Sequence, residues 1–392
     1  MGDNWKTYRV SDFIEINPKV PLKKGMPYSF VEMKDLNASN KYVLPSVTKE
    51  LNGGARFQNR DTLFARITPC LENGKICQVK NLENNLGFGS TEFLIFRGKK
   101  DISDSDFIFY LSRAPFFRKF AEAKMIGTSG RQRVAKDAFE NFVLELPNIK
   151  EQRAIASILS ALDDKIELNL QMNKTLEDMA MALYKHWFVD FGPFQDGEMV
   201  DSELGEIPKG WEVKRLSLLA NFKNGKGLMN KFKKEDGAYN VFGSNGIIGR
   251  TNEFMFDKPV IAIGRVGANY GEVHYSIYPC WISDNAITVQ PMDQKYYWWL
   301  LQRLRLIDYN NFVAGSAQPL ITQGAIKEVE CVVPKDVLLI DFSRKLDLLF
   351  SQLQNNISEN QTLTTLRDTL LPKLISGELR VKGVEKMLTE VL

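Results

Sequence analysis

Two stretches of the sequence, 148–191 and 334–376, repeat apolar residues at alternating spacings of three and four positions. The first contains neither proline nor glycine, and the second has none between its first residue and Pro372. This alternation is typical of an α-helix that packs against a second helix in a coiled coil. The pattern therefore predicts two long helices that bury their apolar stripes against each other.

Asparagine interrupts the apolar stripe in the middle of each predicted helix. Asn169 and Asn173 lie in the first stretch, and Asn356 and Asn360 occupy the matching heptad positions of the second. A buried amide lowers stability but fixes register, because a slipped helix would leave it facing Leu or Ile without a partner. We expect the four amides to meet where the helices cross. In the alternative, they are exposed and the stripe drifts past them.

The chain carries the same pattern twice. WKTYRVSDFIEIN begins at Trp5 and WEVKRLSLLANFK at Trp211, while ELPNIKEQ around Pro147 resembles VVPKDVLL around Pro334. From these prolines onward the offset between the copies is constant, whereas the parts before them differ in length. Internal repetition of this kind indicates a tandem duplication, in which a variable part precedes a helix of fixed length.

The variable parts, 1–147 and 211–333, mix strand and helix patterns. GFGSTEFLIFR and CWISDNAITVQ predict strands, and SDFIFYLSRAPFFRKFAEAKM and KYYWWLLQRLRLI predict short helices. Gly, Pro and acidic residues between the halves predict a linker over 192–210, and 377–392 is left as a C-terminal tail. The expected fold class is α+β, with two mixed α/β domains joined by the two long helices.

Composition and charge agree with a folded chain of two or three domains. Of 392 residues, 44% are hydrophobic and 25% charged, and 51 basic against 48 acidic side chains leave a net charge of +3. A nucleic-acid partner would therefore need a local basic surface. A polar N-terminus and the lack of an apolar run of about 18 residues predict a cytoplasmic protein without a membrane partner.

Catalytic motifs do not stand out in the sequence. There is no GxxxxGK[ST] loop for a nucleotide and no convincing glycine-rich loop for S-adenosylmethionine. Four Cys without a CxxC pair and only two His argue against a zinc site. We therefore expect no catalytic residues, no metal site and no bound cofactor.

A basic segment interleaved with phenylalanines lies between Arg113 and Lys136 and contains the loop GTSGRQR (127–133), whose counterpart is VAGSAQP (313–319). Arg and Gln pair with base edges, and hydroxyls and amides contact phosphates. In the alternative, this is a solvated basic helix face with its aromatic rings in the core. The predicted DNA-binding residues are Arg66, Lys75, Arg118, Lys119, Arg131, Gln132, Arg133, Lys223, Lys226, Arg265, Ser316 and Gln318.

Arg66 and Arg265 differ from the other predicted DNA-binding residues in that they occupy matching positions of the two copies of the repeat. DTLFARITPCLENGKI surrounds the first, and KPVIAIGRVGANYGEV surrounds the second. Two interpretations stay open for them, a phosphate anchor and a structural ion pair.

Three segments resemble specificity subunits of type I restriction–modification systems. They are LPNIKEQRAIASILSALDDKIELNLQMNKTLEDMAMALYKHWFVDFGPF, ELGEIPKGWEVKRL and LRDTLLPKLISGELRV, and the resemblance extends to the variable–helix–variable–helix order of the whole chain. It implies two target recognition domains that each read half of a split, asymmetric site in double-stranded DNA. It also implies an antiparallel, pseudo-two-fold pair of spacer helices. Arg367, at a d position, and Pro372 depart from the coiled-coil pattern.

The resemblance also implies a division of labour among subunits. The specificity subunit binds DNA without performing chemistry. Two modification subunits would carry S-adenosylmethionine and methylate adenine, and restriction subunits would use ATP and Mg²⁺ for translocation and cleavage. Two other functions remain open from the residues themselves, a coiled-coil scaffold that binds protein and a stand-alone DNA-modifying enzyme. Salt-independent binding would favour the first, and cofactor binding by the purified chain the second.

Overall fold

The computed structural model describes residues 5–128, 130–314 and 319–383, and the chain divides into two compact units. Unit 1 comprises Met1–Gln171 and Asn356–Leu392, and unit 2 comprises Met172–Asn355. Each unit thus contains one globular domain and a segment of each long helix. We refer to 5–147 as the first domain and to 211–333 as the second domain.

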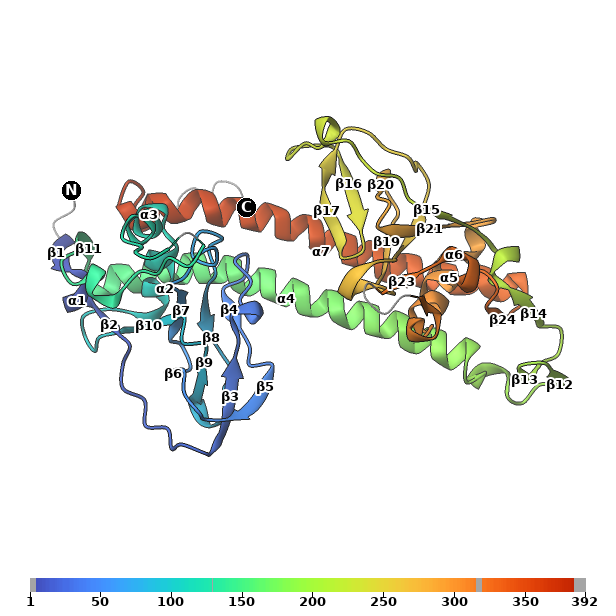
Figure 1. Cartoon of the computed structure of the whole chain (residues 1–392), viewed down its shortest axis with the longest axis horizontal. Helices are drawn as coiled ribbons and strands as arrows, with labels where there is room; N and C mark the ends of the chain where they lie inside the picture. Colours follow the sequence, from blue (N-terminus) through green and yellow to red (C-terminus); the bar gives the residue numbers. More distant parts are fainter. Residues whose placement is uncertain (1–4, 129, 315–318, 384–392) are drawn as a thin grey trace. The chain divides into compact units, whose positions relative to one another are not determined.

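The two long helices are α4 (Ile149–Phe188) and α7 (Asp336–Ser376) (Figure 1). Both helices predicted from the heptad pattern are confirmed. Each begins slightly later than the predicted range, and α4 also ends earlier than predicted. The helices run antiparallel inside each unit. In unit 1, Asp163 and Asn169 of α4 contact Arg367 and Asn360 of α7, in opposite order along the two helices. In unit 2, aromatic side chains near the end of α4 pack on Phe342 near the start of α7.

The first domain is built on two sheets and a short strand pair. Helices α1 (Val10–Phe13), α2 (Ser105–Arg113) and α3 (Pro115–Ala123) complete it, with α2 packed on the larger sheet. The larger sheet has the order β2 (Ile14–Ile16), β10 (Phe93–Gly98), β7 (Thr62–Ala65), β8 (Ile76–Val79), β4 (Tyr42–Val43). The smaller has the order β5 (Val47–Glu50), β3 (Pro27–Val31), β9 (Leu86–Gly89), β6 (Ala55–Gln58). The pair is β1 (Trp5–Arg9) with β11 (Val143–Pro147).

The second domain repeats this topology with fewer strands. The larger sheet has the order β15 (Ala220–Asn224), β21 (Ala286–Pro291), β18 (Val260–Gly264), β19 (Val273–Ser276). The smaller is β17 (Gly246–Thr251), β16 (Tyr239–Gly243), β20 (Cys280–Ile282). The other elements are β14 (Glu212–Arg215), β24 (Glu330–Val333), β22 (Val313–Ala314), β23 (Leu320–Ile321), α5 (Tyr297–Arg305) and α6 (Gln323–Ile326). The matching strand order supports the duplication predicted from the sequence.

The segment 192–210 is more ordered than the predicted linker. It contains an antiparallel hairpin of β12 (Met199–Ser202) and β13 (Gly205–Pro208). Ile207 is 3% exposed and belongs to the hydrophobic core of unit 2. The sequence did not reveal the hairpin inside the predicted linker, because Gly and Pro mark the turns of a hairpin as well as the course of a loop.

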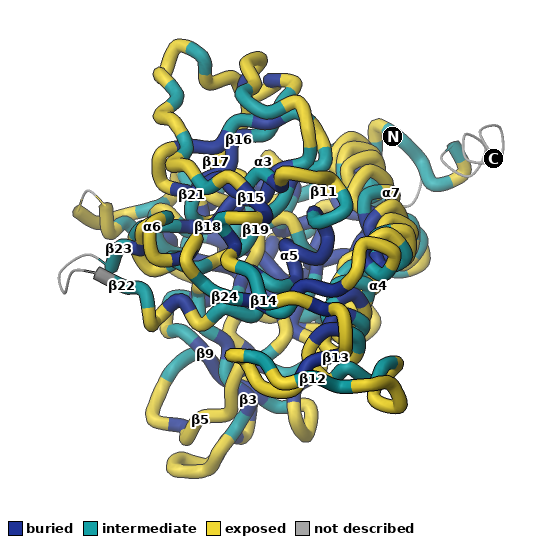
Figure 2. The backbone as a smooth tube through the Cα atoms, turned by 90° about the vertical axis from the view of Figure 1, so that its right-hand side faces the viewer, coloured by how far each residue is buried: buried dark blue, intermediate teal, exposed yellow. Residues whose placement is uncertain are grey.

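The core of each unit joins the domain to its helix segments. In unit 1, Phe64, Phe96, Phe117 and Phe139 pack together, and side chains from both long helices extend this cluster. The helix α7 continues through Pro372, and Leu374 and Ile375 in its last turn are buried. Figure 2 shows the inner strand β18 of unit 2 buried and α7 exposed along much of its length.

Candidate nucleic-acid interface

Arg66 stands where the central strand β7 of the first domain ends. Its backbone N–H donates to the carbonyl of Glu92 (3.0 Å), and its carbonyl accepts from the N–H of Val134 (2.9 Å). These two bonds hold the arginine between the end of the sheet and the segment that follows the loop 127–132.

Arg265 occupies the same position in the second domain, directly after β18. Its N–H donates to the carbonyl of Asn285 (3.0 Å), and its carbonyl accepts from the N–H of Ile321 (3.0 Å). The match of Arg66 with Arg265, first read from the sequence, is thus a structural equivalence of backbone pairing. The side chains of Arg66 and Arg265 are therefore attached at equivalent positions of the two sheets.

Each arginine lies beside the base of a hairpin. In the first domain, Ile126 and Arg133 exchange backbone hydrogen bonds of 3.0 and 2.9 Å. We call the segment 126–133, which consists of this pair and the loop 127–132 between them, the first hairpin. In the second domain, Ala314 pairs with Leu320 in β22 and β23, which form the second hairpin. The predicted contacts Ser316 and Gln318 lie outside the described residues.

The Nε atoms of Arg66 and Arg265 are buried, and neither has a hydrogen-bond partner among the described residues. Within the same residues neither guanidinium forms an ion pair, although Nη1 of Arg265 donates to the Asp284 carbonyl (3.3 Å). A buried donor without a partner costs roughly 1–3 kcal/mol. Within the described residues the structure therefore shows no ion pair for either arginine, and phosphate anchoring stays a prediction.

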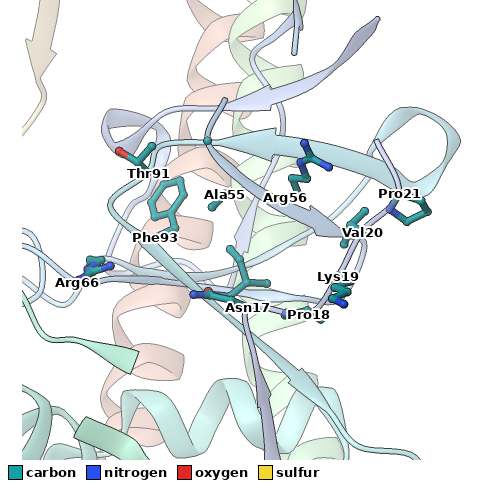
Figure 3. Close-up of a pocket in the computed structure, with 12 residues that line it drawn as sticks. Asn17, Pro18, Lys19, Val20, Pro21, Ala55, Arg56, Arg66, Thr91 and Phe93 are labelled. Atoms are coloured by element: carbon teal, nitrogen blue, oxygen red, sulfur yellow. The ribbon is translucent and has the colours of Figure 1, made fainter. Parts of the chain in front are cut away.

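A cleft of about 710 Å³ opens beside Arg66 in the first domain (Figure 3). Arg66 lies at one end of it, and Lys19 and Pro21 lie at the other. Arg56 adds a third cation, with Nη1 donating to the Leu22 carbonyl (3.3 Å). The twelve residues that line the cleft include no carboxylate. The cleft is therefore suited to an anion such as a DNA phosphate.

Sequence reasoning missed Lys19 and Arg56. They are distant in sequence from each other and from Arg66, and neither belongs to the basic segment that suggested DNA binding. The only feature of the local sequence that could have drawn attention to Arg56 is the Gly53-Gly54 pair before it, which indicates a turn with a close backbone contact. Gly54 has a φ of +103°, and a side chain there would collide with the backbone of Gly89.

Three of the predicted DNA contacts are engaged with protein groups. The Lys75 ammonium donates to the Met33 carbonyl (2.9 Å), and Arg118 donates to the Glu72 carbonyl (2.8 Å). Arg133 donates from Nε and Nη2 to the Glu92 carboxylate, with the shortest contact at 2.7 Å, and this hydrogen bonding raises the pKa of Arg133. We call the last pair the clamp, because it joins the base of the first hairpin to the sheet.

Other predicted contacts in the first domain stay accessible. Lys119 and Arg131 are exposed, and the backbone of half-buried Gln132 pairs with Thr68. Phe117 and Phe120 of the basic segment pack in the core, where the Phe120 ring stacks on another ring at 3.7 Å, whereas Phe116 is exposed. The alternative interpretation thus holds for two of the three phenylalanines, and DNA contact by the exposed cations stays a prediction.

In the second domain, the predicted Lys223 and Lys226 are both exposed at the end of β15. Their carbonyls accept hydrogen bonds from the side chains of Thr288 (3.1 Å) and Trp281 (2.6 Å). Gly225 between them lies so close to the backbone of 282–283 that a side chain would not fit. The backbone is therefore held while both ammonium groups remain at the surface.

The central asparagines bring the two helices together in unit 1. The Asn169 amide donates to Oδ1 of Asn360 (2.9 Å) and to the Glu359 carboxylate (2.8 Å). Asn169 and Asn356 are 0% and 3% exposed, so the exposed alternative is wrong for these two. Asn173 is half-buried in unit 2. The role of this polar layer in fixing register stays a prediction.

The part of the chain that the structure describes contains no cluster of His, Cys, Asp or Glu able to hold a metal ion. No described helix combines the length and apolarity that crossing a membrane requires.

Comparison with known proteins defines the class of this fold. A family model described as the type I restriction modification DNA specificity domain matches residues 2–178 and 208–358, one match in each half of the repeat. The chain is thus a tandem pair of DNA specificity domains. It belongs to the type I restriction–modification DNA specificity family.

Individual relatives are named as specificity subunits, and one solved structure has a similar fold. The chain is 28% identical to the type I restriction enzyme MjaIX specificity subunit of Methanocaldococcus jannaschii, over 72% of this chain and 71% of the relative. It is 25% identical to the type I restriction enzyme HindI specificity subunit of Haemophilus influenzae, over 96% of this chain and 100% of the relative. The crystal structure of the type I restriction–modification S subunit from M. genitalium is similar in fold, with a TM-score of 0.53, 19% identity and coverage of 95% and 96% of the two chains.

Proposed function

We propose that this chain selects the DNA sequence for a type I restriction–modification complex. Each domain reads half of a split site in double-stranded DNA. The halves differ in sequence because the two hairpins differ in chemistry, GTSGRQR in one and VAGSAQP in the other. The two long helices separate the domains and leave the base pairs between the half-sites unread.

One observation carries this proposal beyond family membership. Arg66 and Arg265 occupy equivalent backbone positions, each beside a hairpin, and each keeps a buried Nε donor without a partner among the described residues. Two equivalent cations fit one repeated ligand, and the phosphate backbone is the part of DNA that does not change with sequence. We assign phosphate anchoring to the two arginines and base reading to the hairpins.

The chain itself performs no chemistry in this proposal. Two modification subunits would supply S-adenosylmethionine and the methyl transfer to adenine, while restriction subunits would supply ATP-driven translocation and cleavage with Mg²⁺. A net charge of +3 is sufficient when partner subunits also contact the DNA.

The test uses the full chain co-expressed with its modification subunits, with host adenine methylation mapped by single-molecule sequencing. A split, asymmetric motif that requires the gene is expected. Arg66→Ala and Arg265→Ala should each weaken DNA binding about uniformly across sequences and reduce the salt slope by about 1. Exposed Lys100, which does not line the cleft, provides the control Lys100→Ala and should change neither quantity.

Two results would count against the proposal. A methylome that is the same with and without the gene would refute the specificity function. An unchanged salt slope in both arginine variants would refute phosphate anchoring and leave the specificity function standing.

A further inference from the structure

A buried charged pair joins the two long helices inside unit 1. Nη1 of Arg367 on α7 lies 2.7 Å from Oδ1 of Asp163 on α4. The two residues are 1% and 3% exposed, which is far below the usual exposure of charged side chains. The residue that departed from the coiled-coil pattern therefore has a specific partner.

The pair also binds the first domain. Nη1 of Arg367 donates to the Ser39 carbonyl (3.0 Å), and the Tyr110 hydroxyl of α2 donates to Oδ2 of Asp163 (2.7 Å). We call Arg367, Asp163, Tyr110 and Ser39 the junction cluster. Its hydrogen bonds connect α4, α7, the helix α2 and the loop before β4.

Further polar contacts surround the junction cluster. Buried Lys41 donates to Ser160 of α4 (2.7 Å) and pairs with Asp106 of α2 (3.1 Å). The Tyr42 hydroxyl donates to Asp164 of α4 (2.9 Å), and Arg113 donates to the Ala38 carbonyl (2.6 Å). The loop 38–42 is thus held to the helices by directional bonds.

The second domain contacts the helices by different chemistry at the equivalent positions. The fixed offset of the repeat places Phe350 where unit 1 has Asp163, and Ala180 where it has Arg367. Both are buried, and the Trp298 ring of α5 stacks on Phe350 at 4.1 Å. The architecture therefore forms without charges at these positions. Replacing a buried ion pair by apolar groups of similar volume is often neutral or stabilising, so stability alone does not explain the pair.

We propose that the junction cluster fixes the rotation of the first domain on the helices of its unit, and thereby the number of unread base pairs between the half-sites. This inference rests on the proposed function. Apolar packing tolerates small rotations, whereas hydrogen bonds lose strength away from their preferred angles. One base pair turns the DNA by about 35° and advances it by about 3.4 Å, so spacer selection requires a fixed orientation. Arg367 and Asp163 are positioning residues for DNA reading and contact no base.

The test is the double variant Asp163→Leu with Arg367→Met, which removes both charges together and leaves neither unpaired. The variant chain is co-expressed with its modification subunits, and the host methylome is sorted by half-site sequence and by spacer length. We expect both half-sites to be unchanged. Methylation at sites whose spacer is one base pair longer or shorter should rise about tenfold. This factor corresponds to a loss of about 1.4 kcal/mol in the discrimination between spacer lengths.

Two further variants separate positioning from folding. Tyr110→Phe removes a single hydroxyl from the cluster and should broaden the spacer in the same direction by a smaller factor. Arg97→Met breaks another largely buried ion pair of the first domain, with Asp61 at 2.6 Å, and touches no cluster residue. It should lower thermal stability and leave the spacer strict.

The outcomes distinguish the inference from the function on which it rests. A folded double variant and a Tyr110→Phe variant that both retain the wild-type spacer would overturn the inference. A broadened spacer in Arg97→Met would also overturn it, because general destabilisation would then explain the effect. A wild-type chain that directs no split-site methylation would instead overturn the proposed function.

Discussion

The two domains share a strand order but differ in what holds the base of the hairpin. In the first domain the clamp joins Arg133 to Glu92 with a shortest contact of 2.7 Å. By backbone pairing, the matching residues of the second domain are Leu320 and Asn285, which cannot form an ion pair. Hydrogen bonds of the main chain are common to both domains and maintain the fold. The side chains at the hairpin are therefore free to differ, and different DNA half-sites can be read on one framework.

Exchange of a whole domain should have the largest effect. Replacing residues 1–147 by the equivalent part of another member of the family is expected to change one half of the methylated site completely and to leave the other half intact. The fixed offset of the helices and the variable length of the domains motivate this result. Methylome sequencing checks it, and a change in both halves would show that the domains do not read DNA independently.

Substitution of the asparagines tests the helices that both domains share. Replacing Asn169, Asn173, Asn356 and Asn360 by Leu should raise the thermal unfolding midpoint by several degrees, at about 2–4 °C per kcal/mol for a folding unit of about 150–250 residues. The same change should permit misregistered or oligomeric forms, since the polar layer no longer penalises slipping. Calorimetry and light scattering measure the two effects. A lower midpoint without oligomers would contradict the assigned role.

Arg131 tests whether an exposed side chain of the first hairpin reads a base. Arg131→Ala should cost about 1–3 kcal/mol of binding and relax one position of the first half-site, while the second half-site stays strict. Lys119→Ala, another exposed cation of the same domain, is the matched comparison and should not relax any base position. If every position remains strict in Arg131→Ala, this residue is not a base contact.

The clamp can be removed from one domain and built into the other. Glu92→Gln should destabilise the first domain only slightly, because the pair is partly exposed to solvent and is screened by it. Asn285→Glu combined with Leu320→Arg should install an equivalent pair in the second domain with a gain no larger than this. Urea unfolding reports on both changes, and proteolysis of the loop 127–132 reports on the loss of the pair in the first domain. Equal proteolysis of wild type and Glu92→Gln would show that the clamp does not hold the hairpin.

The smallest effect concerns Glu359, whose pKa is lowered from its ordinary 4.5 by hydrogen bonds from Asn169 and Lys165. A carboxylate with a depressed pKa in the folded state stabilises the fold above its unfolded pKa and loses that contribution as the pH falls through the folded value. We therefore expect a small drop in the unfolding midpoint below about pH 4.5. Glu359→Gln should lack this drop, and an identical pH profile would refute the assignment.

Much of the framework could be predicted from local patterns. The heptads predicted α4 and α7, and the alternating segments around Phe93 and Ile287 predicted strands that are confirmed as β9, β10, β20 and β21. Arg66 and Arg265 were matched by similarity of their flanking residues, and backbone hydrogen bonds show the same match. These features depend on neighbours in sequence, and the sequence displays such neighbours directly.

The roles of individual cations depended on partners that are distant in sequence. Lys75 and Arg118 looked as suitable for DNA as Arg131, but their hydrogen bonds go to backbone carbonyls of other segments. Lys19 and Arg56 looked ordinary and line the cleft with Arg66.

The sequence by itself determined the duplication, the two helices, the α+β class and the family, because each rests on periodicity or on runs of adjacent residues. Only the tertiary structure decided that Arg367 pairs with Asp163 and the Ser39 carbonyl. An arginine at a d position looks like a fault in a coiled coil until its partners on the other helix and in the first domain are known. A buried charge is tolerated only where directional partners meet it, and chain folding, rather than local sequence, brings those partners together.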